Sequence, residues 1–267
     1  MPLTDQLRLR LKQLRLSGIL ETLDMRLRQA EDETWAHLEF LERLLEDEVE
    51  RRHHKQLALR LRRASFQSDK TLERFDFSFN PQINKQAIMN LATCQFIERK
   101  ESVLIIGQTG TGKSHLSQAL GHEACRKGFD VVYVNAAKML LQLHAGRADG
   151  SFERRFATLI RPDLLIIDDF GLKPLRPPAH EDFYDIISER YDKPKGATII
   201  TSNRALAEFP GLLGDPLIAS AGLDRLFDSA HVITMTGASF RARNRNKALD
   251  MTHLPKPELP KPMAESS

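Results

Sequence analysis

The sequence predicts an α/β protein with a parallel sheet, preceded by a small all-helical domain. From Ser102 on, five short β-branched or aliphatic runs alternate with helical stretches, and these runs are SVLII, DVVYV, LLII, ATIIT and HVITM. Apolar strands separated by helices are typical of a parallel sheet covered on both faces. Residues 7–63 contain no proline, and leucines recur there at helical spacing, as in Leu7, Leu11, Leu14 and Leu38, Leu41, Leu45. This spacing predicts the helical N-terminal domain.

Breaks in the patterns divide the chain further. Ser17-Gly18 and the polar stretch over residues 31–34 are the expected breaks between N-terminal helices, and another helix is expected over residues 87–98. The tail is proline-rich without apolar periodicity, which favours a flexible segment, with a short docking peptide as the alternative. We therefore expect four segments: a helical domain (1–66), a linker (67–86), an α/β domain (87–249) and the tail (250–267).

Composition limits the class of protein. With 267 residues, 41% of them hydrophobic, the chain can bury a sizeable core and one smaller module. The formal charge of +3 permits a polyanionic partner without requiring one. Cys94 and Cys125 have neither metal-ligand spacing nor the density of a disulfide scaffold. No stretch approaches the roughly 20 apolar residues that span a bilayer, so we expect a cytoplasmic protein without a membrane partner.

The strongest local signal is the segment GQTGTGKS, Gly107–Ser114, which fits the pattern G-x-x-x-x-G-K-[ST]. An apolar strand precedes it and a helix that stops at Gly128 follows, so its context agrees with a phosphate-binding loop. Lys113 would supply a positive charge to the β- and γ-phosphates and Ser114 a hydroxyl to Mg²⁺. The alternative is a chance glycine turn before a helix. The predicted nucleotide contacts here are Gly107, Gln108, Thr109, Gly110, Thr111, Gly112, Lys113, Ser114 and His115.

Two adjacent carboxylates follow the apolar run in LLIIDDFG, residues 164–171. In a P-loop protein, a carboxylate at the end of a later apolar strand lies beside the Mg²⁺-bound phosphates. We therefore expect Asp168 to be the metal partner and Asp169 to orient the attacking water. The alternative for Asp169 is an N-cap or turn former before Phe170-Gly171, and both roles can coexist.

Two further polar groups complete the expected site. Asn203 follows the strand ATIIT and could help to hold the water near the γ-phosphate. Arg225 could reach the γ-phosphate of a neighbouring subunit, as arginines do in ATPases that assemble; the alternative is an ion pair with Asp224 or Asp228. The sequence contains no N-K-x-D motif of the kind that recognises guanine, so it does not support GTP binding.

The order of the segments GQTGTGKSHL, LLIIDDFG, TSNR, LDRL and GASFRAR resembles the AAA+ ATPases of the DnaA/DnaC clade. The leucine-rich leader, together with the linker FDFSFNPQINKQ, is similar to the IstB family, the ATP-binding helpers of IstA/IstB-type transposons. The resemblance runs from about Leu7 to Arg245. It implies a sheet of order 5-1-4-3-2 with a small helical lid in an AAA+ domain over residues 87–249.

The resemblance also implies roles for single residues. Arg225 would be the arginine finger, Arg241 the lid-side arginine that senses nucleotide, with Arg243 as its competitor, and Phe79 would lie in the linker segment that packs the adenine base. The clade carries a helical segment after the second strand that lines a DNA-binding surface, and the matching residues are Lys138, Arg147, Arg154 and Arg155. AAA+ proteins usually have glutamate at the position of Asp169.

A second basic cluster lies in RRHHKQLALRLRR, residues 51–63. Part of its charge is expected to be neutralised by the i,i+4 pairs Asp47–Arg51 and Glu48–Arg52. The remaining candidates for DNA contact are Lys55, Arg60, Arg62 and Arg63. No aromatic residues interleave with them, so contacts would be to phosphates and sensitive to salt.

Together these features predict an ATP-dependent DNA-binding protein that uses ATP and Mg²⁺, forms homo-oligomers on duplex DNA and assists an IstA-like transposase. Aspartate is one methylene shorter than glutamate, roughly 1.5 Å, so Asp169 predicts slow hydrolysis that DNA, oligomerisation or a partner stimulates. The first alternative is a DnaC-type helicase loader that favours single-stranded DNA. The second is a P-loop small-molecule kinase.

Overall fold

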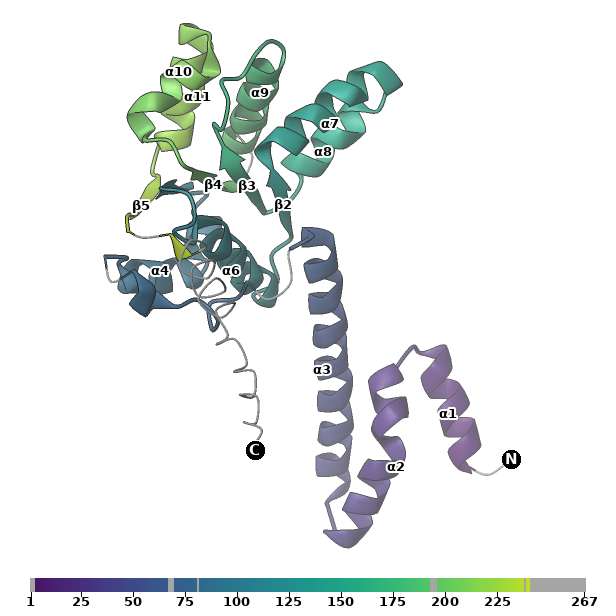
Figure 1. Ribbon diagram of the computed structural model, residues 1–267. Helices are drawn as coiled ribbons and strands as arrows, with labels where there is room; N and C mark the ends of the chain where they lie inside the picture. Colours follow the sequence, from purple (N-terminus) through teal and green to yellow (C-terminus); the bar gives the residue numbers. More distant parts are fainter. Residues whose placement is uncertain (1–2, 67–69, 81, 193–195, 238, 241–267) are drawn as a thin grey trace, which may run out of the picture.

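Three helices build the N-terminal part of the protein. The computed structural model describes residues 3–66, 70–80, 82–192, 196–237 and 239–240. The first helices are α1 (Leu3–Gln13), α2 (Ser17–Asp32) and α3 (His37–Ala64). The break expected at Ser17-Gly18 is wrong, because these residues begin α2 and the chain leaves the helix over residues 14–16. The break expected over residues 31–34 is found two residues later, over residues 33–36. Leu11, Ile19, Leu23 and Leu44 form a small buried core between them. Figure 1 shows α3 reaching from this helical part to the α/β part.

Polar contacts fix α2 against α3. The backbone N–H of Gly18 donates to the buried Glu48 carboxylate at 2.6 Å. Glu48 also accepts from Arg52 at 2.7 Å, which confirms that expected pair. The expected Asp47–Arg51 pair is wrong. Asp47 instead pairs with Arg26 at 2.7 Å and Arg51 with Glu21, because α2 lies along α3 and supplies both partners.

Short helices connect this part to the sheet. They are η1 (Phe77–Phe79), α4 (Lys85–Ala92) and α5 (Gln95–Glu98). The single helix expected over residues 87–98 is therefore divided. The division falls at Cys94, whose φ of 64° lies in the left-handed region and interrupts the helical backbone.

The α/β part is built on five parallel strands, β1 (Val103–Gly107), β2 (Val131–Asn135), β3 (Leu164–Phe170), β4 (Ala197–Ser202) and β5 (His231–Met235). Their order is β2-β3-β4-β1-β5, which is the predicted 5-1-4-3-2 read from the other edge. The α/β prediction is confirmed. Residues of β1, β3 and β4 are buried on both faces of the sheet, which explains their continuous apolar runs.

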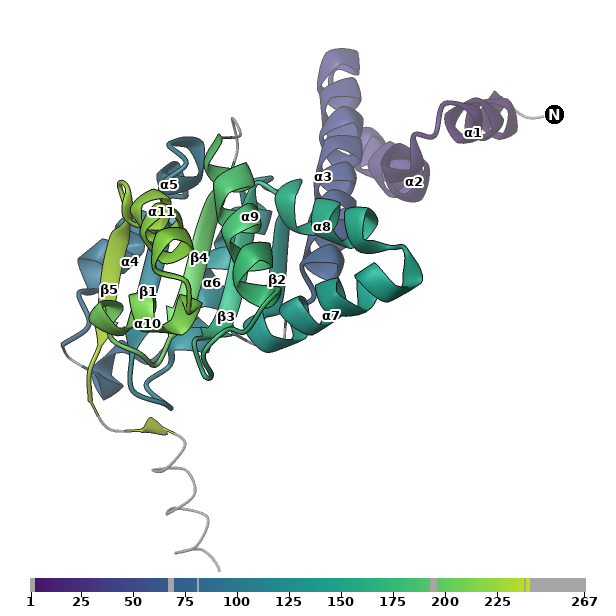
Figure 2. The same ribbon diagram turned by 90° about the horizontal axis from the view of Figure 1, so that it is seen from above.

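Helices cover both faces of this sheet (Figure 2). One face packs against the end of α3, α4, α5 and α6 (Lys113–Arg126). The other packs against α7 (Ala136–Asp149), α8 (Phe152–Ile160), α9 (Ala179–Asp192), α10 (Phe209–Leu213) and α11 (Pro216–Phe227), with η2 (Leu206–Glu208) beside α10. None of the helices among the described residues is long and apolar enough to span a bilayer.

A buried arginine joins α9 to the edge of the sheet opposite the P-loop. The Arg190 side chain is 1% exposed. Its guanidinium donates to the carbonyls of Leu159 at 2.9 Å, Pro162 at 3.0 Å and Ala197 at 2.6 Å, and to the Thr198 hydroxyl at 3.1 Å. One side chain therefore satisfies carbonyls from the α8–β3 connection and from β4.

The predicted division into four segments stays a prediction. The proline-rich tail over residues 250–267 lies outside the described residues, as do Arg241 and Arg243.

Candidate nucleotide site

The segment over residues 107–112 forms a loop between β1 and α6, with Gly112 as the N-cap of the helix. Gly107 has a φ of 148°, and a Cβ at this position would lie 2.0 Å from the Met235 carbonyl oxygen, so no other residue fits. Lys113 is 6% exposed, and its ammonium donates to the Gln108 carbonyl at 2.8 Å. Thr111 donates to the same carbonyl at 2.9 Å. Two side chains of the same segment thus donate to the Gln108 carbonyl, which holds the loop together at the N-terminus of α6.

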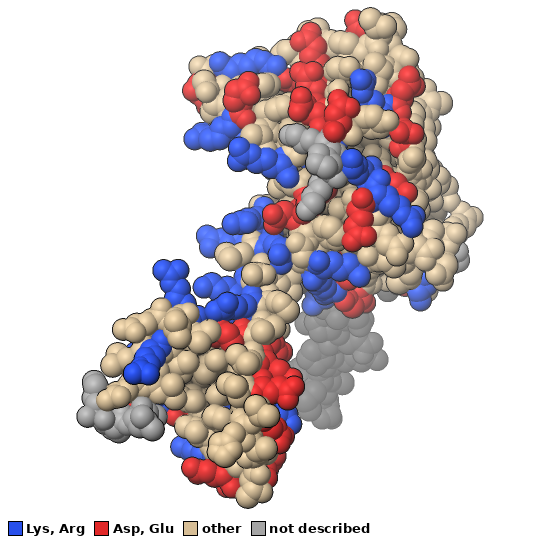
Figure 3. Space-filling model, turned by 180° about the vertical axis from the view of Figure 1, so that it is seen from behind, with Lys and Arg blue, Asp and Glu red and all other residues tan. Residues whose placement is uncertain are grey.

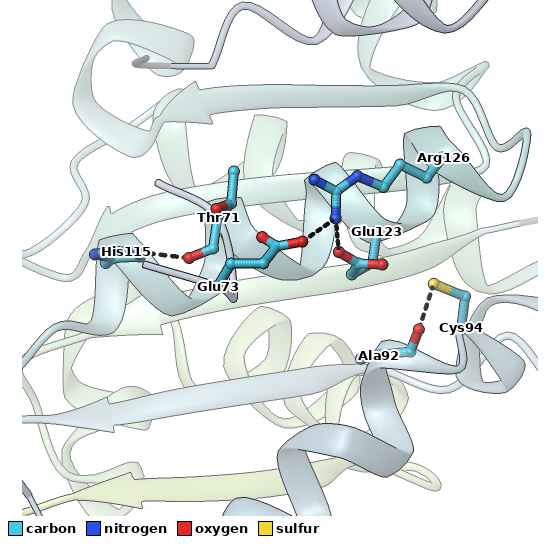
Figure 4. Close-up of polar contacts among 7 residues, drawn as sticks. All are labelled: Thr71, Glu73, Ala92, Cys94, His115, Glu123 and Arg126. Atoms are coloured by element: carbon cyan, nitrogen blue, oxygen red, sulfur yellow. Dashed lines mark hydrogen bonds and ion pairs between the residues drawn. The ribbon is translucent and has the colours of Figure 1, made fainter. Parts of the chain in front are cut away.

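The linker runs along the P-loop and the first turns of α6. The His115 ring contacts the Thr71 carbonyl at 3.0 Å and lies edge-on to the Phe75 ring at 5.2 Å. Arg126 lies between Glu73, at 2.7 Å, and Glu123 (Figure 4). The Thr71 hydroxyl, the Glu73 backbone amide and Arg126 lower the pKa of the Glu73 carboxyl to about 2. The linker is therefore held to α6 at both of that helix's ends.

The chain after β5 contacts the same loop. The Phe240 backbone N–H donates to the Gly110 carbonyl at 3.0 Å. Phe79, expected beside the adenine, lies edge-on to Phe240 with ring centroids 5.1 Å apart. The Asn80 amide donates to the Thr236 carbonyl. The linker and the segment after β5 thus meet next to the P-loop, and Phe79 takes part in that contact.

The two carboxylates on β3 have different surroundings. Asp168 is 4% exposed and accepts hydrogen bonds from the Tyr133 hydroxyl on β2 and the Thr201 hydroxyl on β4, both at 2.6 Å. Asp169 is half-buried, and its backbone N–H donates to the Thr201 hydroxyl oxygen at 3.0 Å. Burial and the Asp168 carboxylate raise the pKa of Tyr133, so its hydroxyl stays protonated and donates.

A β-bulge separates these carboxylates. The register between β3 and β4 shifts between Ile167 and Phe170, and Asp169 has a φ of 56°. The strand thus continues through the acid pair and ends at Phe170, one residue beyond the carboxylates that were expected at its end. The left-handed backbone of Asp169 agrees with its alternative interpretation as a turn former.

A pocket of about 700 Å³ brings several of the predicted residues together. Ser114, Asp168 and Asp169 line it, and so do the basic residues Arg63, Lys70 and Lys138. Ser114 and Asp168 offer oxygen donors, which fits the ligand preference of Mg²⁺. The described residues include no cluster of three or more His, Cys, Asp or Glu side chains that could hold a metal without further ligands.

Asn203 and Arg225 do not line this pocket. Asn203 is exposed directly after β4. Arg225, on α11, donates to the Tyr184 hydroxyl at 3.3 Å and to the Ala221 carbonyl at 3.1 Å, with its guanidinium 5.6 Å from the Tyr184 ring centroid. Among the described residues Arg225 has no ion pair with Asp224 or Asp228, and Asp228 accepts from the Tyr191 hydroxyl instead, so that alternative is wrong.

Three of the residues predicted to contact DNA have partners within the chain. Arg147 forms a two-pronged pair with the fully buried Asp182, with one contact at 2.8 Å, and its guanidinium lies 4.2 Å from the Phe152 ring centroid. Arg155 contacts Asp149 at 2.7 Å, and Arg60 lies 4.0 Å from Asp130. Each of the three arginines thus has an acidic partner within the chain, and its charge can be explained without a contact to DNA.

The other predicted DNA contacts are exposed and have no hydrogen bond or ion pair from their side chains within the described part of the chain; these are Lys55, Arg62, Arg63, Lys138 and Arg154. Figure 3 shows Lys and Arg side chains bordering the hollow between the helical part and the α/β part. The pocket beside Asp168 opens where α3 ends, since Arg63 and Ser65 line it together with Lys138 on α7. Basic residues from distant parts of the sequence therefore gather at one place.

Tyr133 and Thr201 are not among the site residues predicted from the sequence. Strand alternation could have found them, because residues on neighbouring parallel strands that face the same side as Asp168 are the ones able to contact it. Lys70, which lies in the linker with no local pattern, was not predicted either.

The sheet order, the loop after β1 and the acid pair on β3 define an AAA+ P-loop protein. The AMPPCP-bound DnaA from Aquifex aeolicus superposes with a TM-score of 0.54 at 22% identity, over 74% of this chain and 58% of that one. DnaI gives a TM-score of 0.52 at 18% identity, over 63% of this chain and 89% of that one. At these identities the likeness concerns the fold alone.

Sequence comparison assigns the chain to one family within the AAA+ P-loop class. The family described as IstB-like ATP binding protein matches residues 9–248, and the chain belongs to it. A Mycobacterium tuberculosis protein named as an ATP-binding protein in an insertion sequence is 41% identical over 90% of this chain and 95% of its own length. A Pseudomonas aeruginosa protein named as an ATP-binding protein of the insertion sequence IS21 is 34% identical, over 90% and 88%.

Proposed function

We propose that this protein is an ATP-dependent DNA-binding ATPase that assembles on duplex DNA and serves a transposase. The observation that carries the proposal is the placement of Ser114, Asp168 and Asp169 around one pocket bordered by Arg63 and Lys138. The relatives named as ATP-binding proteins of insertion sequences support the connection with transposition.

The P-loop would hold the phosphates of ATP. The backbone amides before α6 would donate to an anion at the helix N-terminus, and Lys113 would add a full positive charge. To bind a phosphate oxygen, the Lys113 ammonium would have to give up its hydrogen bond to the Gln108 carbonyl. When bound, Mg²⁺ would neutralise charge on the terminal phosphates. Ser114 and Asp168 are the residues that would hold it.

Asp169 would orient the water that attacks the γ-phosphate. Its half-buried carboxylate lies at the bulge, one residue beyond Asp168, and Asn203 would assist from the end of β4. Arg225 would act on the nucleotide of a neighbouring protomer, which requires its guanidinium to leave Tyr184. A single protomer thus lacks one cation of its site, so hydrolysis is slow until protomers assemble.

Duplex DNA would contact the exposed basic residues that border the hollow. Their contacts are to phosphates, so affinity falls with salt and depends little on sequence. Arg63→Ala and Lys138→Ala should each reduce the slope of log affinity against log salt by about 1. Arg99→Ala is the matched control, because Arg99 is exposed beside α5 and outside the pocket.

The deciding experiment compares binding to duplex and single-stranded DNA of equal length, with and without ATP, while the size of the complexes is measured. ATP-dependent oligomers that prefer duplex DNA are the expected result. A preference for single-stranded DNA would favour a helicase loader. ATP binding without any DNA binding, together with phosphate transfer to a small acceptor, would replace the proposal with a kinase.

A further inference from the structure

The Asp168 carboxylate is held from both sides by hydroxyl groups. Tyr133 on β2 donates to Oδ2 and Thr201 on β4 donates to Oδ1, each at 2.6 Å. Hydrogen bonds of this length to a carboxylate are at the strong end of the protein range, because the acceptor is charged. The two donors come from the strands on either side of β3, so together they fix the plane of the carboxylate.

The Tyr133 ring contacts Phe66, which follows the C-terminal end of α3. Phe66, two residues beyond the last residue of α3, lies with its ring centroid 6.3 Å from that of Tyr133 and 4.5 Å from that of His122. Gly121 makes room for this ring, since a Cβ there would lie 2.6 Å from Phe66 Cζ. A continuous set of contacts therefore leads from α3 through Phe66 and Tyr133 to Asp168.

We propose that Tyr133 is a positioning residue that holds Asp168 for Mg²⁺, and that Phe66 makes this position depend on α3. The inference rests on the proposed function, in which Asp168 is the metal partner. Residues that hydrogen-bond to a metal ligand set its orientation, and their loss typically lowers metal affinity or activity by roughly 10- to 100-fold. The helical N-terminal part would in this way act on the nucleotide site without touching the nucleotide.

The test is Tyr133→Phe in the full chain, because this change keeps the ring against Phe66 and removes only the hydroxyl. The affinity for a fluorescent non-hydrolysable ATP analogue is measured across a Mg²⁺ titration and in EDTA. We expect the Mg²⁺ concentration for half-maximal effect to rise roughly 10-fold or more, with the affinity in EDTA unchanged. A purely structural role for Tyr133 would lower both affinities together.

Tyr191→Phe is the matched control. Its hydroxyl also donates to a carboxylate, that of Asp228 at 2.8 Å, but it lies on the exposed side of α9. This variant should keep the Mg²⁺ dependence of the wild-type protein. The inference is overturned if Tyr133→Phe behaves like Tyr191→Phe.

The dependence on α3 has its own test. Phe66→Ala should shift the Mg²⁺ dependence in the same direction as Tyr133→Phe, and the double variant should be no worse than Tyr133→Phe alone. Additive effects would overturn the coupling, because they would mean that Phe66 acts through another route. If the wild-type protein bound the analogue with no response to Mg²⁺, the proposed function would fail as well, whereas a normal wild-type response with an unaffected Tyr133→Phe variant would sink only this inference.

Discussion

Arg147 offers a sharp test, because the structure gives it a role that differs from the one its charge predicts. Its guanidinium is paired with Asp182, whose side chain is fully buried, and it also covers the Phe152 ring. Arg147→Ala would leave a buried carboxylate without its cation. Breaking a buried pair costs about 3–5 kcal/mol, and we expect about 3 kcal/mol because the Arg147 side chain is itself 38% exposed.

The measurement is equilibrium unfolding in urea, with thermal melting beside it. A loss of about 3 kcal/mol corresponds to a fall in the melting temperature of roughly 6–12 °C in a chain of this size. Arg154→Ala is the control, because Arg154 is exposed on the neighbouring helix α8 and should melt like the wild-type protein. The double variant Arg147→Leu, Asp182→Leu should recover much of the lost stability, since no buried charge is then left unpaired.

If Arg147→Ala unfolds at the wild-type urea concentration, the pair with Asp182 does not stabilise the fold. A direct role in DNA binding would show differently. It would lower affinity for duplex DNA at a temperature where the variant is fully folded, and to the same extent as Arg154→Ala.

Further outcomes follow from other parts of the structure. Lys113→Ala should abolish ATP-dependent assembly on duplex DNA, whereas Asp169→Asn should keep ATP binding and prolong the assembly, as gel filtration with labelled DNA would show; identical behaviour would contradict the separation of binding from hydrolysis. Burial, with the nearby Arg126, lowers the pKa of His122, so its contribution to stability is present above its ordinary value of about 6.5 and is lost as the pH falls through the folded-state pKa. His122→Gln should therefore flatten the fall in urea midpoint between roughly pH 7.5 and pH 5.5, and an unchanged pH dependence would exclude this origin. Arg190→Met should lower the free energy of unfolding by about 3 kcal/mol or more, because several buried carbonyls lose their donor; a wild-type midpoint in urea would show that these carbonyls find other partners.

The parts of the fold that the sequence predicted correctly are those with local signals. Strands and helices follow from the spacing of apolar residues, and the P-loop follows from fixed positions within eight residues, Gly107–Ser114. The order of the strands came from the resemblance to a known class, since the spacing of the runs does not fix it.

Contacts between distant residues could not be predicted in this way. Arg147 and Asp182 are 35 residues apart, and nothing near either of them indicates the pair. The choice of Arg26 over Arg51 by Asp47 depends on how α2 lies on α3. A charged side chain in a sequence can contact a ligand or a neighbouring helix, and only the packing decides between them.

The helix α3 has a geometric consequence for the whole molecule. It is 28 residues long, which at 1.5 Å per residue gives about 42 Å, and its C-terminal end packs against β2 and α6 beside the pocket that Ser114 and Asp168 line. A tilt of roughly 10° at that end would move the far end by roughly 7 Å over this length. Under the proposed coupling through Phe66, such a tilt would accompany changes at Asp168, and a distance label near His37, at the far end of α3, would detect it with the greatest amplitude.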